Sequence, residues 1–232
     1  QDIDELMEQV RYLEFTGGEP FMIKEHFDLL QRMVDKGIAQ DVEIHYNTNG
    51  TQFPEHAEEI WKNFKLVEIA FSIDDVEERF EYQRANAVWD EVNTNMDRFE
   101  SMRNRNTNIQ LQVCSTVNVF NVLYLEELAN WIDQRSFDYV YWNMLHEAYY
   151  HSVGTLPERA KELVSKKLLS ANVSDFHMKE FVKIVDFMQS GASLDGNILR
   201  MKISDVDWRR QQDLRTHHSE LADAIDYEGP RT

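Results

Sequence analysis

Cysteine is nearly absent from this chain, since its 232 residues include only one, Cys114. A single thiol excludes an internal disulfide framework, and we therefore expect a reducing, cytoplasmic environment. Long apolar stretches are missing as well, because no run approaches the roughly 20 residues that a membrane span needs. Neither a signal-peptide pattern nor an initiator methionine opens the chain, so we expect it to be part of something longer.

Positive charge is also scarce. The chain has 24 Lys and Arg against 42 Asp and Glu, a formal net charge of −18. Such a charge repels polyanions and disfavours nucleic-acid binding. We therefore expect the partner to be a small molecule or a basic one. The sequence contains no Gly-x-Ser-x-Gly elbow, no phosphate-binding loop with its lysine and no dinucleotide fingerprint.

The chain does contain apolar runs that alternate with amphipathic segments. The predicted strands are 11–16, 42–47, 66–73, 109–117 and 139–145. The predicted helices between them cover 27–34, 54–64, 89–102 and 125–132. This alternation indicates parallel strands with helical crossovers, hence an α/β partial barrel. Three helices without strands follow at 157–170, 176–189 and 198–217, so we expect a barrel core over 1–150 and a helical C-terminal extension over 151–232.

Polar residues follow each of the first four apolar runs. These strand ends are 16–20, 47–50, 72–75 and 115–118. In parallel α/β folds ligands bind at the carboxyl ends of the strands, which makes these residues the candidate site. Gly, Asn, Asp and Ser also form turns for purely structural reasons, and that alternative stays open.

The order of these strand ends resembles a known family. Gly17-Gly18-Glu19-Pro20, Thr48-Asn49-Gly50, Ser72-Ile73-Asp74, Arg84 and Asn118 follow one another as in the radical S-adenosylmethionine (SAM) superfamily, from its second strand onward. The resemblance implies a partial (β/α) barrel whose first strand-helix unit lies outside this chain. It also implies S-adenosylmethionine and a [4Fe-4S] cluster as the cofactors of the intact protein.

The resemblance assigns cofactor-binding roles to individual residues. Gly17, Gly18 and Glu19 would lie against the amino group of SAM, with Pro20 fixing the turn. Further residues would meet its ribose, carboxylate or adenine: Asn49, Ser72, Asp74, Arg84 and Asn118. Asp75 stands where the family usually has glycine. The sequence therefore departs from the family pattern directly after Asp74. For Arg84 the structural alternative is an ion pair with Glu77, Glu78 or Glu81.

The CxxxCxxC triplet that holds the cluster in this family does not occur in the chain. Three thiolates are required to hold three irons and leave the fourth open to SAM. Cys114 cannot supply them and, inside an apolar strand, fits a small core residue. We therefore expect neither cofactor to be bound by this chain alone, and we assign it no catalytic residue.

Two functions remain open. The first is a fragment or a cluster-less relative of a radical SAM enzyme, which would reductively cleave SAM to modify a peptide or a small molecule. Its partners would be that substrate, an electron donor in the intact enzyme, and a second copy of the chain through an exposed strand edge. The alternative is a non-catalytic binding protein that uses the barrel as a recognition surface.

Other candidate features have plainer interpretations. The histidines of His146-Glu147-Ala148-Tyr149-Tyr150-His151 are five residues apart rather than four, which disfavours a zinc metalloprotease helix. His45, within a predicted strand, either points inward toward a site or is a satisfied core histidine. His217 and His218 most resemble a solvated tail.

Two C-terminal features complete the candidates. The aromatic stretch 139–145, with Tyr149 and Tyr150, would face the substrate in such a barrel, although core packing explains alternate residues equally well. Asp205, Arg209 or Arg210, and Glu220-Leu221 resemble the short twitch-like C-terminal extension of some radical SAM proteins.

Overall fold

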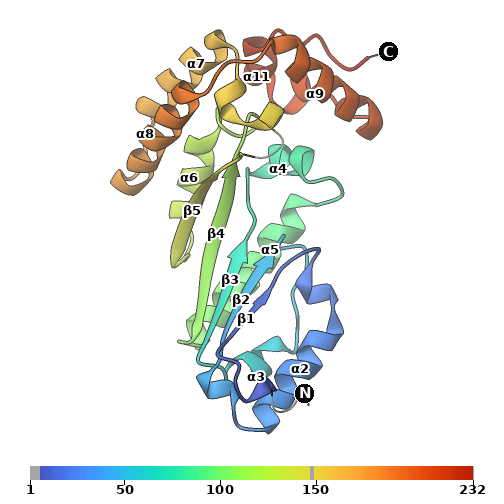
Figure 1. The fold of residues 1–232 in the computed structure, drawn as a ribbon, viewed down its shortest axis with the longest axis vertical. Helices are drawn as coiled ribbons and strands as arrows, with labels where there is room; N and C mark the ends of the chain where they lie inside the picture. Colours follow the sequence, from blue (N-terminus) through green and yellow to red (C-terminus); the bar gives the residue numbers. More distant parts are fainter. Residues whose placement is uncertain (1–5, 147–148, 232) are drawn as a thin grey trace. The chain divides into compact units, whose positions relative to one another are not determined.

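The computed structural model describes residues 6–146 and 149–231 (Figure 1). The strands are β1 (Tyr12–Phe15), β2 (Glu43–Thr48), β3 (Leu66–Phe71), β4 (Ile109–Val117) and β5 (Tyr139–Met144). The helices that follow or separate them are α2 (Lys24–Asp35), α3 (Ala57–Trp61), α4 (Glu77–Gln83), α5 (Trp89–Arg105), α6 (Leu125–Asp133), α7 (Glu158–Leu169), α8 (Asp175–Ser190), α9 (Gly196–Arg210), α10 (Leu214–His217) and α11 (Ser219–Ala224). Short 3-10 helices are η1 (Pro20–Met22), η2 (Ala39–Asp41), η3 (Tyr149–His151) and η4 (Val153–Thr155).

The strands form one sheet in the order β1-β2-β3-β4-β5, which is also their order along the chain. The pairs β1–β2, β2–β3 and β3–β4 are parallel. Beside β4, the amide of Asp138 donates to the carbonyl of Leu111 and the amide of Leu145 to that of Val117, so β5 runs in the same direction. The predicted α/β class with parallel strands is thus confirmed.

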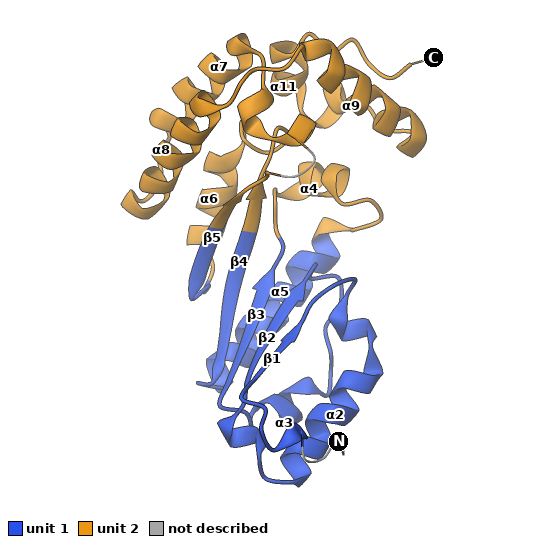
Figure 2. Cartoon of the chain, viewed as in Figure 1, with its two compact units in different colours: residues 1–72, 90–114, 136–141 blue, residues 73–89, 115–135, 142–232 orange. Residues whose placement is uncertain are grey.

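The chain divides into two compact units (Figure 2). Unit 1 comprises residues 1–72, 90–114 and 136–141, and unit 2 comprises 73–89, 115–135 and 142–232. Each unit therefore draws on segments that are distant in sequence. The boundary expected near residue 150 stays a prediction, because compactness in space does not test a boundary along the chain.

In unit 1, one face of the sheet packs against helices. Tyr46 of β2 is fully buried, lies 5.3 Å from the ring of Trp61 in α3, and accepts a 3.2 Å hydrogen bond from its indole N–H. Phe71 of β3 meets Phe99 of α5 edge to face at 5.2 Å. Large rings on alternate strand positions thus anchor the helices to this face.

The other face of the same strands is polar and only half covered. In β2, Glu43, His45 and Asn47 are partly exposed, whereas the residues between them are buried. His45 lies with its Nδ1 3.3 Å from Oε2 of Glu68 on β3, so it is a partnered histidine of this face. Parallel sheets are usually covered on both faces, which makes this open face unusual.

Unit 2 is mainly helical. Trp142 of β5 packs edge to face against Phe181 of α8 at 5.8 Å, and its indole N–H donates to Nδ1 of His177 at 3.2 Å. Nε2 of the same histidine lies 3.0 Å from a carboxylate oxygen of Asp133. Because the indole can only donate, Nδ1 accepts and Nε2 carries the proton, so the pairing determines the tautomer of this buried ring.

Two sequence predictions need correction, and one helix was missed. The last predicted helix, 198–217, is broken at Gln211, which takes a left-handed φ of 54° that ends α9 before α10 begins. The helix expected from residue 54 starts only at Ala57. Helix α4 was not anticipated, because its short polar sequence lacks a helical apolar stripe and it forms by tertiary contact.

Candidate functional site

The loop after β1 is held by the carboxylate of Glu19, which is buried at 8% exposure. The Thr48 hydroxyl lies 2.8 and 2.9 Å from its two oxygens, the Asn49 amide donates to Oε2 at 2.9 Å, and the Phe21 amide donates to Oε1 at 3.3 Å. Glu19 thereby caps η1, with Pro20 at its first position, and ties this loop to the end of β2. The chain itself thus occupies most of the accepting capacity of this carboxylate.

The two glycines before Glu19 adopt left-handed backbone conformations. Their φ angles are 88° at Gly17 and 60° at Gly18, values that L-residues rarely take. An added Cβ at either position would meet nothing within 4 Å. The glycines are therefore needed for the turn and not for packing, and the backbone beside them is open.

In unit 2, the segment after β3 is organised by Asp74. Its carboxylate accepts from the Thr116 amide and from the Arg84 guanidinium, both at 2.7 Å, and its carbonyl accepts from the Asn121 amide group at 2.8 Å. Arg84 does form an ion pair, as its structural interpretation predicted. Its partner, however, is Asp74 and not Glu77, Glu78 or Glu81. Arg84 Nε is buried and has no partner among the described residues.

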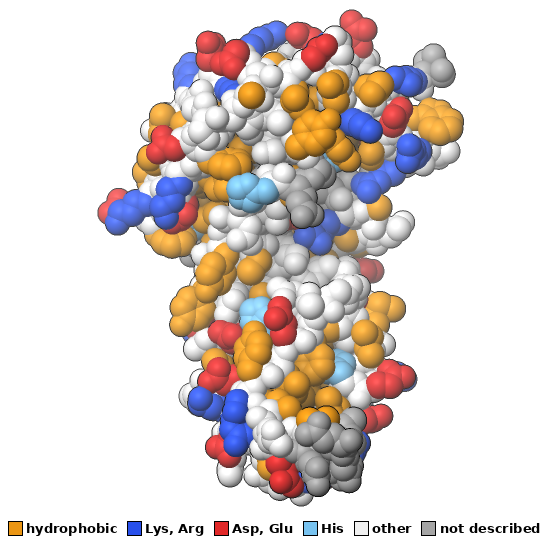
Figure 3. All heavy atoms as spheres, viewed as in Figure 1, with side chains coloured by type: hydrophobic (Ala, Val, Ile, Leu, Met, Phe, Trp, Pro, Cys, Tyr) orange, Lys and Arg blue, Asp and Glu red, His pale blue; other side chains and the backbone are white. Residues whose placement is uncertain are grey.

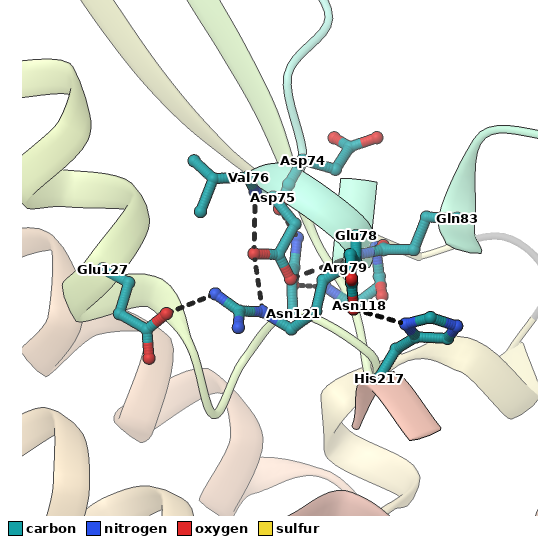
Figure 4. Close-up of polar contacts among 10 residues, drawn as sticks. All are labelled: Asp74, Asp75, Val76, Glu78, Arg79, Gln83, Asn118, Asn121, Glu127 and His217. Carbon is teal, nitrogen blue, oxygen red and sulfur yellow. Dashed lines mark hydrogen bonds and ion pairs between the residues drawn. The ribbon is translucent and has the colours of Figure 1, made fainter. Parts of the chain in front are cut away.

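Asn118 follows β4 and closes a tight side-chain turn. Its Oδ1 accepts from the Phe120 amide at 2.9 Å, and its Nδ2 donates to the Thr116 carbonyl at 3.0 Å and to Oε1 of Gln83 at 3.2 Å. Gln83 ends α4, so this amide pair joins α4 to the end of β4 (Figure 4). The segments that follow β3 and β4 are thus connected by the side-chain amides of Gln83 and Asn118 and by the carboxylate of Asp74.

A cavity of about 230 Å³ in unit 2 lies beside this network. It is lined by Asp74, Tyr82, Gln83, Asn118, Phe120, Leu145, His151, Val206 and Arg210. Asp74 and Asn118 were predicted site residues, and the cavity brings them together. Arg210 had been noted only for its C-terminal resemblance, Leu145 only within the aromatic stretch 139–145, and His151 only within the histidine motif. Tyr82, Gln83, Phe120 and Val206 were missed because their positions along the chain carry no motif.

His151 is one of the residues that line the cavity. Its Nε2 is buried and has no hydrogen-bond partner among the described residues. Its ring meets Phe120 edge to face at 5.0 Å. Burial, together with nearby Lys202, lowers the pKa of His151 below its usual value, so the ring is neutral near pH 7. A buried ring nitrogen without a hydrogen-bond partner is costly to the folded state.

Asp75, the departure from the family pattern, lies fully buried next to this network. Its Oδ1 accepts from the Val76 amide at 2.9 Å and from Nε of Arg79 at 3.0 Å, and Arg79 also pairs with Glu127 (Figure 4). Burial raises the pKa of Asp75 to about 7, although Arg79 acts to lower it. Asp75 therefore braces α4, and Asp74 keeps its place beside the cavity.

The other histidine predictions have mixed outcomes. The solvated-tail interpretation is wrong for His218, which is fully buried beside the ring of Tyr82 at 4.8 Å, whereas His217 pairs with Glu78 at 3.2 Å. Residues 147 and 148 of the histidine-rich motif lie outside the described residues. In the aromatic stretch, Trp142 is buried but Tyr139 and Tyr141 are about half exposed.

The residues of this chain do not fit an iron–sulfur cluster. Such a cluster needs three thiolates, and the single cysteine, Cys114, is half-buried within β4. Among the described residues no group of His, Cys, Asp and Glu is arranged to hold a metal ion. The residues that line the cavity, by contrast, include side-chain amides and aromatic rings.

A match to a family model tests the family resemblance that the strand-end residues predicted. The sequence model of the Radical SAM superfamily matches residues 1–134, more than half of the chain. The chain belongs to the radical SAM superfamily. The predicted resemblance is thereby confirmed, and the parallel sheet is the superfamily's partial barrel.

Solved radical SAM structures share this fold. Native anSMEcpe with bound AdoMet and the Cp18Cys peptide matches with a TM-score of 0.50 and 16% identity, over 78% of this chain and 53% of that chain. The complex with the Kp18Cys peptide gives 0.52 and 16% over 78% and 53%, and the complex with AdoMet alone gives 0.51 and 16% over 86% and 57%. This chain thus spans a little more than half the length of these proteins. At this identity the likeness shows the fold alone.

No curated protein matches the chain. No described helix combines the length and the apolar composition that crossing a bilayer requires.

Proposed function

We propose that this chain is the SAM-binding portion of a radical SAM protein and that the cavity of unit 2 takes the adenosyl part of the cofactor. The observation that carries the proposal is the cavity itself. Asp74 and Asn118, assigned to SAM from separate strand ends, both line it, together with the ring of His151. Membership of the superfamily supports SAM as the ligand.

Each lining group has a role in this proposal. The rings of Tyr82 and Phe120 lie 5.8 Å apart and supply apolar surface for a planar base. The side-chain amides of Gln83 and Asn118 and the ring nitrogen of His151 supply hydrogen bonds to base or ribose. Such a mixture of ring faces and a few polar groups is typical of small-molecule pockets.

The predicted SAM residues of unit 1 stay predictions from the family resemblance, separate from the cavity of unit 2. Gly17 and Gly18 leave backbone groups accessible, Pro20 starts η1, and Asn49 and Ser72 follow β2 and β3. Glu19 acts mainly by holding this loop in shape, because its oxygens are engaged by Thr48, Asn49 and Phe21. Arg84 remains a candidate for the carboxylate of SAM only through the family resemblance.

The reaction of the whole protein is the second half of the proposal. In the intact protein a [4Fe-4S] cluster would supply the electron that splits SAM into methionine and a 5′-deoxyadenosyl radical, and this chain does not contain the three thiolates that would hold the cluster. The substrate class we propose is a peptide, since the similar anSMEcpe structures hold peptides. A small-molecule substrate is the alternative within the same reaction.

Binding measurements test the cofactor site. Calorimetric titration of this chain with SAM and with adenosine should give weak and similar affinities, because the cluster that anchors the methionine end is missing. His151→Phe keeps the ring contact with Phe120 but removes the nitrogen, so it should weaken adenosine binding by up to about tenfold, the worth of one hydrogen bond. It should leave thermal stability unchanged or slightly higher.

The control is Glu162→Gln, an exposed position on α7, which should alter neither quantity. Adenosine binding that is undetectable in the unsubstituted chain, or unaffected by His151→Phe, would refute the proposed cavity. The alternative function, a non-catalytic recognition protein, is favoured if the full coding sequence upstream of Gln1 lacks CxxxCxxC.

A further inference from the structure

The strands of this protein carry charge of only one sign. The sequences of β1 to β5 contain three acidic residues, Glu14, Glu43 and Glu68, and neither lysine nor arginine. The strand register pairs Glu14 with His45, His45 with Glu68, and Tyr12 with Glu43. All three carboxylates therefore lie on the same face, the open face of the unit 1 sheet. In the space-filling view of Figure 3, acidic and histidine side chains lie among hydrophobic ones over these strands.

One of these carboxylates is held in a defined position. Oε1 of Glu68 accepts from Nε2 of Gln112 at 2.9 Å, and Oε2 lies 3.3 Å from Nδ1 of His45. Gln112 is only 3% exposed, so its amide is a rigid support. The carboxylate is oriented by an amide and an imidazole, and a quarter of the Glu68 side chain stays exposed to receive a further partner.

Within the part of the chain that the structure describes, two of the three carboxylates on this face have no Lys or Arg partner. Glu43 pairs with Lys65 at 2.7 Å. Among the described residues, Glu14 accepts only from the Asn47 amide at 3.4 Å, and Glu68 has the two partners given above. Partial burial raises the pKa of Tyr12, and Glu14, Glu68 and Glu43 each add to that shift, so the field of all three reaches one exposed tyrosine. A cation at this face would offset their mutual repulsion.

We propose that the open face of the unit 1 sheet, formed by Tyr12, Glu14, His45, Glu68 and Gln112, docks a lysine or arginine side chain of a peptide substrate. The proposal rests on the proposed function and names its substrate class. The cationic head donates to the exposed oxygens of Glu68 and Glu14, and the ring of Tyr12, which is half exposed, receives its aliphatic stem. The chain's net charge of −18 attracts the same class of peptide over longer distances.

Fluorescence anisotropy with designed peptides tests this docking site. The probes are acetylated, amidated and fluorescein-labelled peptides of one length in a Gly-Ser background, with Lys, Gln or Glu at the same alternate positions. At low ionic strength the Lys peptide should bind at least about tenfold more tightly than the Gln peptide, and the Glu peptide should not bind. Raised salt should weaken the Lys peptide most.

Matched charge-removal variants identify the binding surface. Glu68→Gln and Glu14→Gln should each weaken binding of the Lys peptide at least about threefold. Glu91→Gln removes the same charge from an exposed position on α5, in the same unit, and should change binding less than about twofold. Glu14 is exposed and makes one long contact, so its variant remains informative if Glu68→Gln does not fold.

The outcomes separate the docking site from the cofactor proposal. Equal binding of the Lys and Gln peptides, unchanged binding in both Glu14→Gln and Glu68→Gln, or equal weakening by Glu91→Gln would overturn the docking site. Adenosine titrated into the same samples reports on the cavity of unit 2. Normal adenosine binding without preference for the Lys peptide rejects only the docking site, and the reverse pattern rejects only the cofactor proposal.

Discussion

At the scale of single residues, Glu19 shows that a family motif serves folding as well as binding. Its carboxylate receives a hydroxyl and two backbone amides, and without it these donors would be buried and unpaired. Removing one partner of a buried hydrogen bond costs more than the bond contributes, because the remaining group is still desolvated. The acid of the motif is therefore a structural tie between the ends of β1 and β2.

We expect Glu19→Ala to lower the free energy of unfolding by about 1–3 kcal/mol. Adenosine binding should change little, since its proposed site is in unit 2. Urea denaturation measures the first effect and calorimetry the second, with Glu162→Ala, an exposed position on α7, as the control. A loss of adenosine affinity without a loss of stability would show that Glu19 acts directly on the ligand.

His218 makes stability depend on pH. Its ring is fully buried and both nitrogens lack partners among the described residues, so burial lowers the pKa to about 3. In the unfolded chain a histidine titrates near 6.5. Between these two values only the unfolded state binds the proton, and stability therefore falls as the pH is lowered through that window.

His218→Phe should reduce this acid sensitivity. Phenylalanine suits the surrounding rings of Tyr82, Phe120 and Tyr124 and carries no unpaired nitrogen, so stability near pH 7 should be equal or higher. The measurement is the difference in urea midpoint between variant and unsubstituted protein across pH 4 to 7. Asp75, whose pKa is raised, changes stability in the opposite direction over this range, but it is present in both proteins and its effect cancels in the difference. A constant difference over that range would contradict the assignment, and His56→Gln, at an exposed position, is the control.

At the scale of elements, α9 matters because two of its residues, Val206 and Arg210, line the cavity. Asp207, between them, is fully buried and accepts from the hydroxyls of Tyr82 at 2.8 Å and Tyr227 at 2.7 Å and from the Leu214 amide at 2.8 Å. Burial, and then the Asp207 charge, raise the pKa of both tyrosines well above the usual value, so both remain donors. This network joins α9 to α4 and to the start of α10.

We expect Asp207→Ala to destabilise the protein by at least about 3 kcal/mol, because three buried donors lose their acceptor. Tyr227→Phe removes one donor and should cost only about 1 kcal/mol. Urea denaturation distinguishes the two, with Tyr139→Phe, at an exposed tyrosine, as the control. Similar small losses in both variants would show that Asp207 does not anchor α9.

At the scale of the whole molecule, the chain has the fold of its superfamily without the ligands of the cluster. Anaerobic reconstitution with iron and sulfide should therefore leave it without a [4Fe-4S] cluster. Iron analysis and electron paramagnetic resonance make the measurement. Cys114→Ala should give the same background iron as the unsubstituted chain, whereas about four irons per chain and a reducible signal would refute the expectation.

The sequence by itself determined the order and type of most elements. Apolar runs bounded by breakers predicted all five strands, and Ile109–Val117 matches β4 at both ends. These signals are local, because alternation and helical spacing are set by residues a few positions apart. The same locality explains the misses at α4 and at Gln211, where tertiary contacts and one left-handed residue decided the boundaries.

Membership of the superfamily also followed from the sequence, since strand-end residues occur in a characteristic order. Only the tertiary structure decided which polar groups meet. It paired Arg84 with Asp74, buried His218, gave Asp75 an arginine partner and placed three carboxylates on one open face. These outcomes depend on long-range packing and strand register, because a charged side chain's partner is chosen by what the fold brings near it and not by its neighbours in the chain.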